Sequence, residues 1–344
     1  MQVKTLDRIR KGILEKRENL SSWLDAVPKN KLQTNLGGKD PGKVNERLVA
    51  MDDAIEKSEE GTLGICVVCH DHVDTALLEM DYTACICLDH YSDEEKRSLE
   101  TELELAQNIH RALLTHYEAN IPGIELAAFS RPAQILGGDY FDIVRFQDGS
   151  YGLVIADVAG HGVSAGLYMA SLQTALRMLI PESNSPVEVV TKIHDLYSHN
   201  VYFNTFVTLF LAAIDPTGST LTYTNAGHNP PLLLCREGGQ VCSSDWLSPT
   251  GAAIGLLENP DFEAVTVPLH PGDLLVLYTD GVTEAMDQQG IFGAERLASY
   301  VLNSVDLPAQ ALVHSLWQHL QDYTQGSPLA DDTTIVALKM GMAQ

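Results

Sequence analysis

Basic residues are scarce in this sequence. Lysine and arginine number 22 against 46 aspartates and glutamates, which gives a formal net charge of -24 at pH 7. Phosphate backbones and anionic lipid surfaces repel a chain that carries this much negative charge. The composition therefore argues against direct binding of nucleic acid and against docking on a membrane. It suits a protein that gathers carboxylates around cations.

Long apolar runs are also missing. The sequence has no stretch of about 18 apolar residues, so it predicts no transmembrane helix. Its first segment, MQVKTLDRIRKGILEKRENL, is charged throughout and lacks the apolar region of a signal peptide. We therefore expect a cytoplasmic protein, in a compartment where disulfides are rare. The six cysteines need another explanation wherever they cluster.

The N-terminal third has the pattern of helices. Apolar residues recur at helical spacing over residues 3–25 and about 44–60, and a glycine- and lysine-containing turn separates them, which predicts an antiparallel helical hairpin. Another helix is expected over 92–116, because residues 92–95 (Ser-Asp-Glu-Glu) place carboxylates at the positive end of a helix dipole. Its apolar steps fit either a short coiled coil or an amphipathic helix packed on its own domain, and both interpretations stay open.

The pattern changes after Pro122-Gly123. Short apolar runs of β type follow, and turns that contain glycine or proline separate many of them. These runs are Tyr151–Asp157, Phe206–Ile214, Leu221–Thr224, Asp273–Tyr278 and Thr333–Leu338. Three longer helical patterns, at about 164–180, 186–198 and 308–323, interrupt them. Strands in runs with helices in runs predict an α+β domain rather than strict βαβ alternation.

Acidic residues stand at the ends of several predicted strands. Asp157 and Asp280 each end an apolar run, Asp331-Asp332 directly precedes another, and Asp139 follows two glycines. An Asp-Gly pair after a strand is by itself a common turn signal. Several carboxylates that converge become favourable when they share cations, because magnesium prefers oxygen ligands. Two such ions about 4 Å apart can hold a hydroxide and clamp a phosphoryl oxygen.

Five motifs that contain these residues occur in a fixed order. They are GGDYFD at 137–142, DVAGHG at 157–162, NAGHNPP at 225–231, YTDGVTEA at 278–285 and DDTT at 331–334. Over about residues 120–340 the chain resembles the SpoIIE/RsbU branch of the metal-dependent, 2C-type (PPM) serine/threonine protein phosphatases. The resemblance implies an α/β/β/α sandwich with two manganese or magnesium ions. It also implies hydrolysis of phosphoserine and phosphothreonine by activated water, without a covalent intermediate.

The resemblance assigns metal ligands by motif. It implies that Asp139 and Asp157 bind the metals, with Asp157 bridging them, and that the backbone carbonyl of Val158 is a further ligand. It implies that Asp280 and Asp331 complete the shell of the second metal. A water between the metals would be the nucleophile. Because this ligand set is intact, we expect an active enzyme rather than a scaffold that only keeps the fold.

Other polar residues near these motifs receive separate interpretations. His161 is either a general acid for the leaving alkoxide, since histidine titrates near neutrality, or an orienting residue in a tight turn. Asn225 and His228 lie in a turn between strands and are interpreted as structural, and Asp332 as a neighbour that orients the ligands. Eukaryotic relatives place an arginine on the phosphate. Arg131 is the nearby candidate here, and the sequence does not assign it that role.

A cysteine cluster precedes the phosphatase-like region. Cys66-Val-Val-Cys69 is followed, after 17 residues, by Cys87-Leu-Asp-His90. Two pairs with two-residue gaps have the spacing of a tetrahedral zinc knuckle, and three thiolates with one imidazole form an established structural set. We predict one structural zinc on Cys66, Cys69, Cys87 and His90, with Cys85 as a non-ligand or an alternate ligand. Residues 48–90 resemble the DksA/TraR-type zinc finger, a family whose helical hairpin enters the secondary channel of RNA polymerase.

These patterns predict three parts. Residues 1–91 form a helical hairpin with a DksA/TraR-like zinc finger, 92–118 a helical linker, and 119–344 the phosphatase domain. The predicted function is that of a protein-serine/threonine phosphatase regulated through its N-terminal module, with a homodimer contact through the linker. By resemblance, its substrate is a phosphorylated STAS-type antagonist of an anti-sigma factor. The alternative, a DksA-type regulator that binds RNA polymerase, needs a longer hairpin with an acidic tip, and only Asp25-Ala26 is similar to one.

Overall fold

The computed structural model divides the chain into two units, Met1–Glu104 and Leu105–Gln344. The residues that it describes are 10, 13, 14, 17, 41–73, 78, 85–114, 121–160, 162–198, 206–257, 259–287, 290–326 and 331–341. Within this part of the chain, no helix combines the length and the apolar character that a membrane span requires.

The first unit contains the second helix of the predicted hairpin, α3 (Pro41–Glu59). Most of the first predicted helix lies outside the described residues, but Ile13 packs with Met51 and Ala54 of α3 in a small apolar cluster. Arg17 pairs with Asp52 at 2.7 Å. The hairpin as a whole stays a prediction. A short 3-10 helix, η1 (Leu88–His90), follows the cysteine cluster, and α5 (Asp93–Leu114) occupies the place of the predicted linker helix.

The second unit is built on two five-stranded antiparallel sheets. The first sheet has the order β2 (Tyr140–Arg145), β3 (Tyr151–Val158), β4 (Val207–Ile214), β5 (Thr220–Ala226) and β8 (Val265–Pro268). The second has the order β1 (Ile124–Arg131), β12 (Thr333–Met340), β9 (Leu274–Tyr278), β6 (Leu232–Glu237) and β7 (Gln240–Trp246). A separate small ribbon joins β10 (Met286–Asp287) and β11 (Gly290–Ile291).

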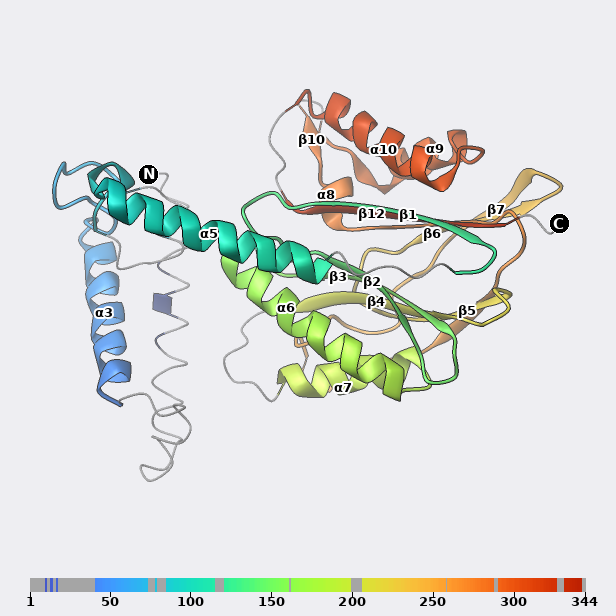
Figure 1. Cartoon of the computed structure of the whole chain (residues 1–344), viewed down its shortest axis with the longest axis horizontal. Coiled ribbons are helices and arrows are strands. Elements are labelled where there is room, and N and C mark those ends of the chain that lie inside the picture. Colours follow the sequence, from blue (N-terminus) through green and yellow to red (C-terminus); the bar gives the residue numbers. More distant parts are fainter. Residues whose placement is uncertain are drawn as a thin grey trace. The chain divides into compact units, whose positions relative to one another are not determined.

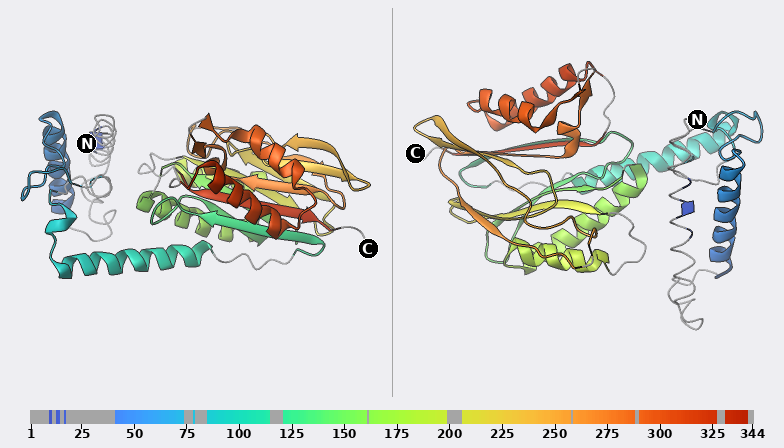
Figure 2. Two further views of the ribbon diagram at one scale, coloured as in Figure 1. Left: turned by 90° about the horizontal axis from the view of Figure 1, so that it is seen from above. Right: turned by 180° about the vertical axis from the view of Figure 1, so that it is seen from behind.

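Helices cover the outer faces of the two stacked sheets, which gives the predicted α/β/β/α order of layers (Figures 1 and 2). The helices α6 (Gly162–Leu179) and α7 (Pro186–Ser198) lie on the first sheet, with η2 (Ile180–Glu182) between them. The helices α9 (Gly293–Asn303) and α10 (Ala309–Tyr323) lie on the second sheet, and the four-residue α8 (Asp280–Thr283) follows β9.

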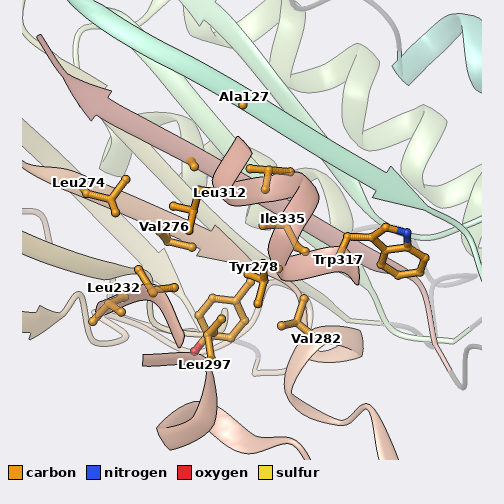
Figure 3. Packing of buried hydrophobic residues seen from close by; sticks show 14 of the residues in the cluster. Ala127, Leu232, Leu274, Val276, Tyr278, Val282, Leu297, Leu312, Trp317 and Ile335 are labelled. Atoms are coloured by element: carbon orange, nitrogen blue, oxygen red, sulfur yellow. The ribbon is translucent and has the colours of Figure 1, made fainter. Parts of the chain in front are cut away.

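Three apolar clusters fill the spaces between these layers, and β3 contributes to two of them. Leu153 and Ile155 face the other sheet, whereas Val154 and Ala156 pack against the helices α6 and α7. Successive side chains of a strand point to opposite faces, so a strand covered on both sides needs apolar residues at consecutive positions. The third cluster joins α9 and α10 to the second sheet, and Figure 3 shows Leu312 and Trp317 of α10 beside Ile335 of β12.

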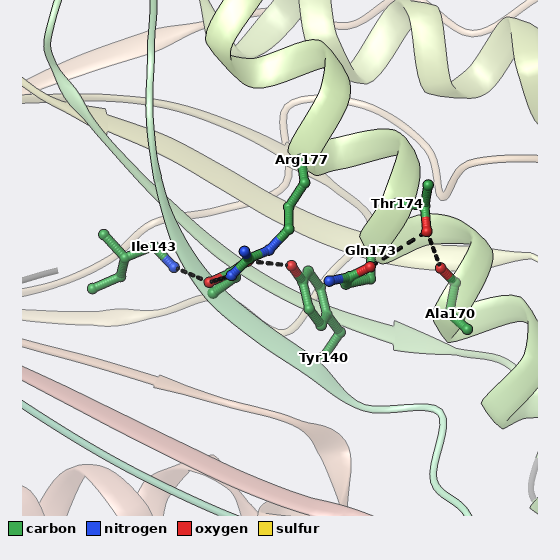
Figure 4. A network of polar contacts seen from close by, with 7 residues as sticks. Tyr140, Ile143, Ala170, Gln173, Thr174 and Arg177 are labelled. Carbon is green, nitrogen blue, oxygen red and sulfur yellow. Dashed lines mark hydrogen bonds and ion pairs between the residues drawn. The ribbon is translucent and has the colours of Figure 1, made fainter. Parts of the chain in front are cut away.

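A buried ion pair fastens α6 to β2 (Figure 4). The Asp142 carboxylate is 2% exposed and accepts hydrogen bonds from Arg177 Nε at 2.7 Å and Arg177 Nη2 at 2.9 Å. The Tyr140 hydroxyl and the Ile143 amide also donate to it, at 2.5 and 2.8 Å. Burial and the Asp142 charge raise the pKa of Tyr140, so its hydroxyl keeps the proton that it donates. The ion pair is therefore fully hydrogen-bonded on its acidic side.

Replacement of Arg177 by methionine should destabilise the second unit, because it leaves the buried Asp142 charge without its counterion. Loss of one partner of such a pair costs about 3 kcal/mol of unfolding free energy. The matched control is Lys192→Met, which breaks the exposed pair with Glu188 on α7 and should cost under about 0.5 kcal/mol. Urea unfolding followed by circular dichroism measures both values. Equal losses for the two variants would contradict the anchoring role.

Candidate active site

The predicted carboxylates lie where strand ends of the two sheets meet. Asp139 directly precedes β2 and Asp157 lies in β3, both in the first sheet. Asp280 begins α8, one residue after β9, and Asp331 and Asp332 directly precede β12. Both strands belong to the second sheet. Hydrogen bonds from the second sheet to Asp139 and charge interactions among the carboxylates join the two sets. Each sheet therefore contributes half of one acidic site.

Asp139 is buried, and its two oxygens have different surroundings. Oδ2 accepts hydrogen bonds from the hydroxyls of Thr279 at 2.8 Å and Thr334 at 2.7 Å. Oδ1 is also buried but has no hydrogen-bond partner among the described residues. Burial and the nearby Asp157 charge raise the pKa of Asp139 well above its ordinary value. A buried, unpartnered carboxylate oxygen fits a site for a cation or a cation-bound water.

The other carboxylates repel one another. Burial, followed by the charges of Asp280, Asp331, Asp332 and Glu284, raises the pKa of Asp157 to about 7. Burial and the charges of Asp331 and Glu284 raise the pKa of Asp280 to about 6. This concentration of negative charge is what divalent cations neutralise. Sequence reasoning missed Glu284, although it follows Asp280 by four residues, across one turn of α8.

Asp332 organises a backbone loop. Its Oδ1 accepts a hydrogen bond from the Ala133 amide at 2.7 Å, and its Oδ2 accepts one from the Gly138 amide at 2.6 Å. His110 of α5 contacts the same loop. Its side chain is buried, and its Nε2 lies 2.9 Å from the Gly137 carbonyl oxygen. A carbonyl can only accept, so Nε2 carries the proton. These contacts hold the loop that leads into Asp139, and sequence reasoning did not assign His110 to the site.

Three motif glycines allow this close packing. A Cβ atom on Gly137 would lie 2.7 Å from Asp332 Oδ2, and one on Gly281 would lie 2.0 Å from the Asp332 carbonyl oxygen. A Cβ on Gly138 would lie 2.8 Å from the carbonyl oxygen of Val158, the predicted backbone ligand. Any larger residue at these positions would push the acidic segments apart. The glycines therefore set how closely the two sheets approach at the site.

Asn225 lies in β5 rather than in the expected turn, His228 lies just after that strand, and together they brace the strand beside Asp157. Asn225 is buried, accepts from the His228 amide at 2.8 Å and donates to the Leu247 carbonyl at 3.0 Å. Nδ1 of His228 lies 2.8 Å from the hydroxyl of Thr208, which pairs with Asp157 across β3 and β4. Burial lowers the pKa of His228 to about 3, so this ring is neutral. These contacts are structural.

The structure leaves the prediction for His161 untested and gives Arg131 a position outside the site. His161 lies outside the described residues. Arg131 is exposed, and its guanidinium carbon stands 5.6 Å from the centroid of the Trp317 ring on α10. Phe129, two positions earlier on β1, stacks on the same ring. Phe129 and Arg131 therefore lie on the helix-covered side of β1. Ser130, which stands between them in sequence, is hydrogen-bonded to Thr334 on the opposite side, where Asp139 lies.

The cysteine cluster forms the tightest group of metal-binding side chains among the described residues. The sulfur atoms of Cys66, Cys69 and Cys87 all lie within 4.8 Å of one another. The predicted fourth ligand, His90, is exposed and lies outside this group, as does Cys85. No set of three or more described carboxylates meets the same distance limit. The acidic site is more open, which suits cations that keep several waters.

Backbone amides in the cysteine cluster favour a negatively charged sulfur at Cys66. The Cys66 sulfur lies 3.4 Å from the amide nitrogens of Val68 and Cys87. Burial alone would raise the pKa of Cys66, but amide hydrogen bonds from Cys69, Cys87 and Val68 lower it to about 6. Burial and the two neighbouring sulfurs raise the pKa of Cys87 to about 12. Three adjacent sulfurs would all be thiolates only with a cation between them, and zinc is an ion that such a donor set favours.

Comparison with known proteins finds relatives in sequence and in fold. The family model described as Stage II sporulation protein E (SpoIIE) matches residues 147–341. The phosphoserine phosphatase RsbU of Bacillus subtilis (strain 168) is 27% identical over 244 residues, which span 71% of this chain and 71% of RsbU. The phosphoserine phosphatase RsbP of the same strain is 26% identical over 70% of this chain and 58% of RsbP.

A solved structure also has the same fold. The SiaA-PP2C domain of Pseudomonas aeruginosa aligns with a TM-score of 0.62 and 23% sequence identity, over 71% of this chain and 98% of that chain. The expected mixed α+β phosphatase fold is thereby confirmed. The enzyme class predicted from the motifs, a protein-serine/threonine phosphatase, is confirmed by the relatives. Because the family model matches more than half of the 344 residues, the chain belongs to the SpoIIE family.

Proposed function

We propose that this chain removes phosphate from phosphoserine or phosphothreonine of a bacterial signalling protein, through water activated by two divalent cations. The observation that carries the proposal is the convergence of Asp139, Asp157, Asp280 and Asp331 from two sheets into one group of mutually repelling carboxylates. The phosphoserine phosphatase activity named for RsbU and RsbP supports the substrate class.

The cation ligands would be the four carboxylates and the backbone carbonyl of Val158. When bound, manganese or magnesium would supply a water with a lowered pKa and would neutralise charge on the phosphoryl oxygens. The chain itself supplies the concentrated negative charge that attracts the cations. Its contribution also includes the hydrogen bonds from the Ala133 and Gly138 amides that hold Asp332 beneath the site.

His161 is the proposed proton donor. Hydrolysis forms a bond between the water oxygen and phosphorus and breaks the bond between phosphorus and the seryl oxygen. The leaving alkoxide then needs a proton, and histidine is a suitable donor near neutral pH. The alternative, an orienting role in the turn after Gly160, predicts a different dependence on the leaving group.

The proposed substrate is a phosphorylated STAS-type antagonist of an anti-sigma factor. We propose that the N-terminal module regulates the reaction and that α5, as part of a linker over 92–118, contributes a homodimer contact. The exposed side chains of Leu105 and Ile109 on α5 support a partner on this helix. No observation on the described residues favours the alternative, binding of RNA polymerase, and its hairpin tip lies outside them.

We also propose that the first unit holds one structural zinc. Cys66, Cys69 and Cys87 supply three thiolates, and the amide hydrogen bonds to Cys66 support a negatively charged sulfur. His90, on η1 three residues after Cys87, is the proposed fourth ligand. Its ring would turn toward the sulfurs on binding, because tetrahedral zinc takes four protein ligands in structural sites.

Asp157→Asn should abolish manganese-dependent hydrolysis of para-nitrophenyl phosphate and of a phosphoserine peptide, while it stabilises the protein in EDTA. Folding raises the pKa of this carboxyl from 3.8 to about 7. Such a group lowers the stability of the folded state increasingly as the pH rises from about 4 to about 7. The variant should therefore melt higher than wild type at pH 8 and show a smaller gain at pH 5. Each ~1 kcal/mol corresponds to about 2–4 °C.

The control for this stability gain is Asp148→Asn in an exposed turn. Hydrogen bonds from Ser150 lower the pKa of Asp148, so its removal should not raise the melting temperature. Retained turnover in Asp157→Asn, or a lower melting temperature than wild type in EDTA at pH 8, would contradict the proposed site.

His161→Asn should separate the two roles of this histidine. An alkoxide leaving group needs a proton, whereas para-nitrophenolate leaves readily without one. A general acid contributes about 10²–10⁴ to rate. The variant should therefore lose at least about 100-fold on a phosphoserine peptide and much less on para-nitrophenyl phosphate. Equal losses of kcat on the two substrates would show the orienting role instead.

Purified protein should contain one zinc per chain, measured by elemental analysis. Cys69→Ser and Cys87→Ser should lose the metal, because three sulfur ligands hold it, and Cys85→Ser should retain it as the matched control. His90→Ala should weaken zinc binding in a competition titration with a chromogenic chelator. Full zinc content in Cys87→Ser would contradict the site, and unchanged affinity in His90→Ala would exclude this histidine as a ligand.

A further inference from the structure

Two threonines of the second sheet meet at Asp139. Thr279 lies between β9 and α8, Thr334 lies in β12, and both are fully buried. Their backbones are joined, since the Thr279 amide donates to the Thr334 carbonyl at 3.1 Å. The Thr334 amide in turn donates to the Thr279 hydroxyl oxygen at 2.9 Å. The pair is thus held rigidly before either side chain reaches the aspartate.

The proton of each hydroxyl can be assigned from its neighbours. The Thr279 oxygen accepts from the Thr334 amide, so its own proton is free to go to Asp139 Oδ2 at 2.8 Å. The competing acceptor, the Asp332 carbonyl, is at 3.5 Å, which is long for an O–H donor. The Thr334 hydroxyl lies 2.7 Å from the same Oδ2 and 2.9 Å from the Ser130 hydroxyl. The Thr334 hydroxyl has one proton to donate, and the charged carboxylate of Asp139 is a better acceptor than the neutral Ser130 oxygen, so Thr334 donates to Asp139.

Both protons therefore go to one oxygen of Asp139. An ionised carboxylate has about four acceptor positions, two on each oxygen, and the threonines occupy the two on Oδ2. Oδ1 keeps both of its positions, is buried, and has no hydrogen-bond partner among the described residues. Leaving such an oxygen without a partner is costly in a buried site. The arrangement is asymmetric, and it selects which oxygen meets a ligand.

We propose that Thr279 and Thr334 are positioning residues of the cation site, which fix the Asp139 side chain so that Oδ1 alone faces the cation or its bound water. This inference rests on the proposed two-cation function. Thr334 lies in β12 and Thr279 directly follows β9, both strands of the second sheet, whereas Asp139 directly precedes β2 of the first sheet. The same hydrogen bonds therefore also tie the two sheets together at the site. A residue that orients a metal ligand typically changes metal affinity by about 10–100-fold when it is replaced.

A purely structural role predicts something different. If the threonines only tied the sheets together, their loss would lower stability and would leave the affinity of the folded protein for cations unchanged. If they position Asp139, a valine, which has the same shape without the hydroxyl, should weaken cation binding even in protein that is fully folded. Serine, which keeps the hydroxyl, should restore it.

The test is direct Mn²⁺ binding to the full chain at pH 8, measured by the electron paramagnetic resonance signal of free Mn²⁺. Thr334→Val should bind at least about 10-fold more weakly than wild type, and Thr334→Ser should bind within about twofold of it. Thr224→Val is the matched control. Thr224 is also a fully buried threonine in the second unit, but its hydroxyl has no hydrogen-bond partner among the described residues. Its replacement should leave Mn²⁺ affinity unchanged.

Circular dichroism in EDTA establishes that each variant is folded at the binding temperature. If Thr334→Val does not fold, Thr279→Val tests the same hydroxyl pair with the same expected loss. Wild-type affinity in a folded Thr334→Val or Thr279→Val would overturn the positioning role while leaving the cation site in place. Absence of Mn²⁺ binding by wild type would overturn the proposed cation site, and this inference with it.

Discussion

The crowding of buried and half-buried carboxylates at one site is the constraint on which the rest of this structure depends. Asp139, Asp157 and Asp280 all have raised pKa values, and burial is the largest cause for each. A site of this kind can exist only inside a scaffold whose stability comes from elsewhere. The three apolar clusters supply that stability, and the ion pair of Asp142 with Arg177 fastens α6 to β2. The acidic site then occupies the strand ends, where the apolar packing stops.

The central strands could be predicted from the sequence because they are buried on both faces. Runs such as Tyr151–Asp157 and Thr333–Leu338 are apolar at consecutive positions, and the structure confirms them as β3 and β12. The edge strands β7 and β8 could not be found in this way, since nearly all of their residues are exposed or half-buried. Helix α9 also escaped prediction. The carboxylates were found because strand-end position and neighbouring glycines are local signals.

The partners of those carboxylates are not local signals. The bond from Thr334 to Asp139 spans 195 positions of the chain, and the bond from the Gly138 amide to Asp332 spans 194. Thr334 belongs to the DDTT motif, but the sequence does not show that its hydroxyl reaches Asp139, and nothing around His110 distinguishes it from an ordinary histidine. Arg131, which the sequence did not assign to the phosphate, shows that closeness in sequence is a weak signal. Its closeness to the site in sequence made it a candidate for the phosphate, yet the alternation of side chains along β1 turns it toward Trp317.

The same repulsion connects stability with function. Each unit by which folding raises the pKa of a carboxyl group corresponds to ~1.4 kcal/mol of unfavourable free energy for its charged form. A bound cation that neutralises several such groups would remove this unfavourable free energy. The repulsion among the carboxylates therefore favours cation binding. The full gain in binding free energy requires carboxylate oxygens that are already oriented toward the cation, because reorienting them on binding would cost part of it. Hydrogen bonds that hold Asp139 and Asp332 in place therefore serve affinity as much as architecture.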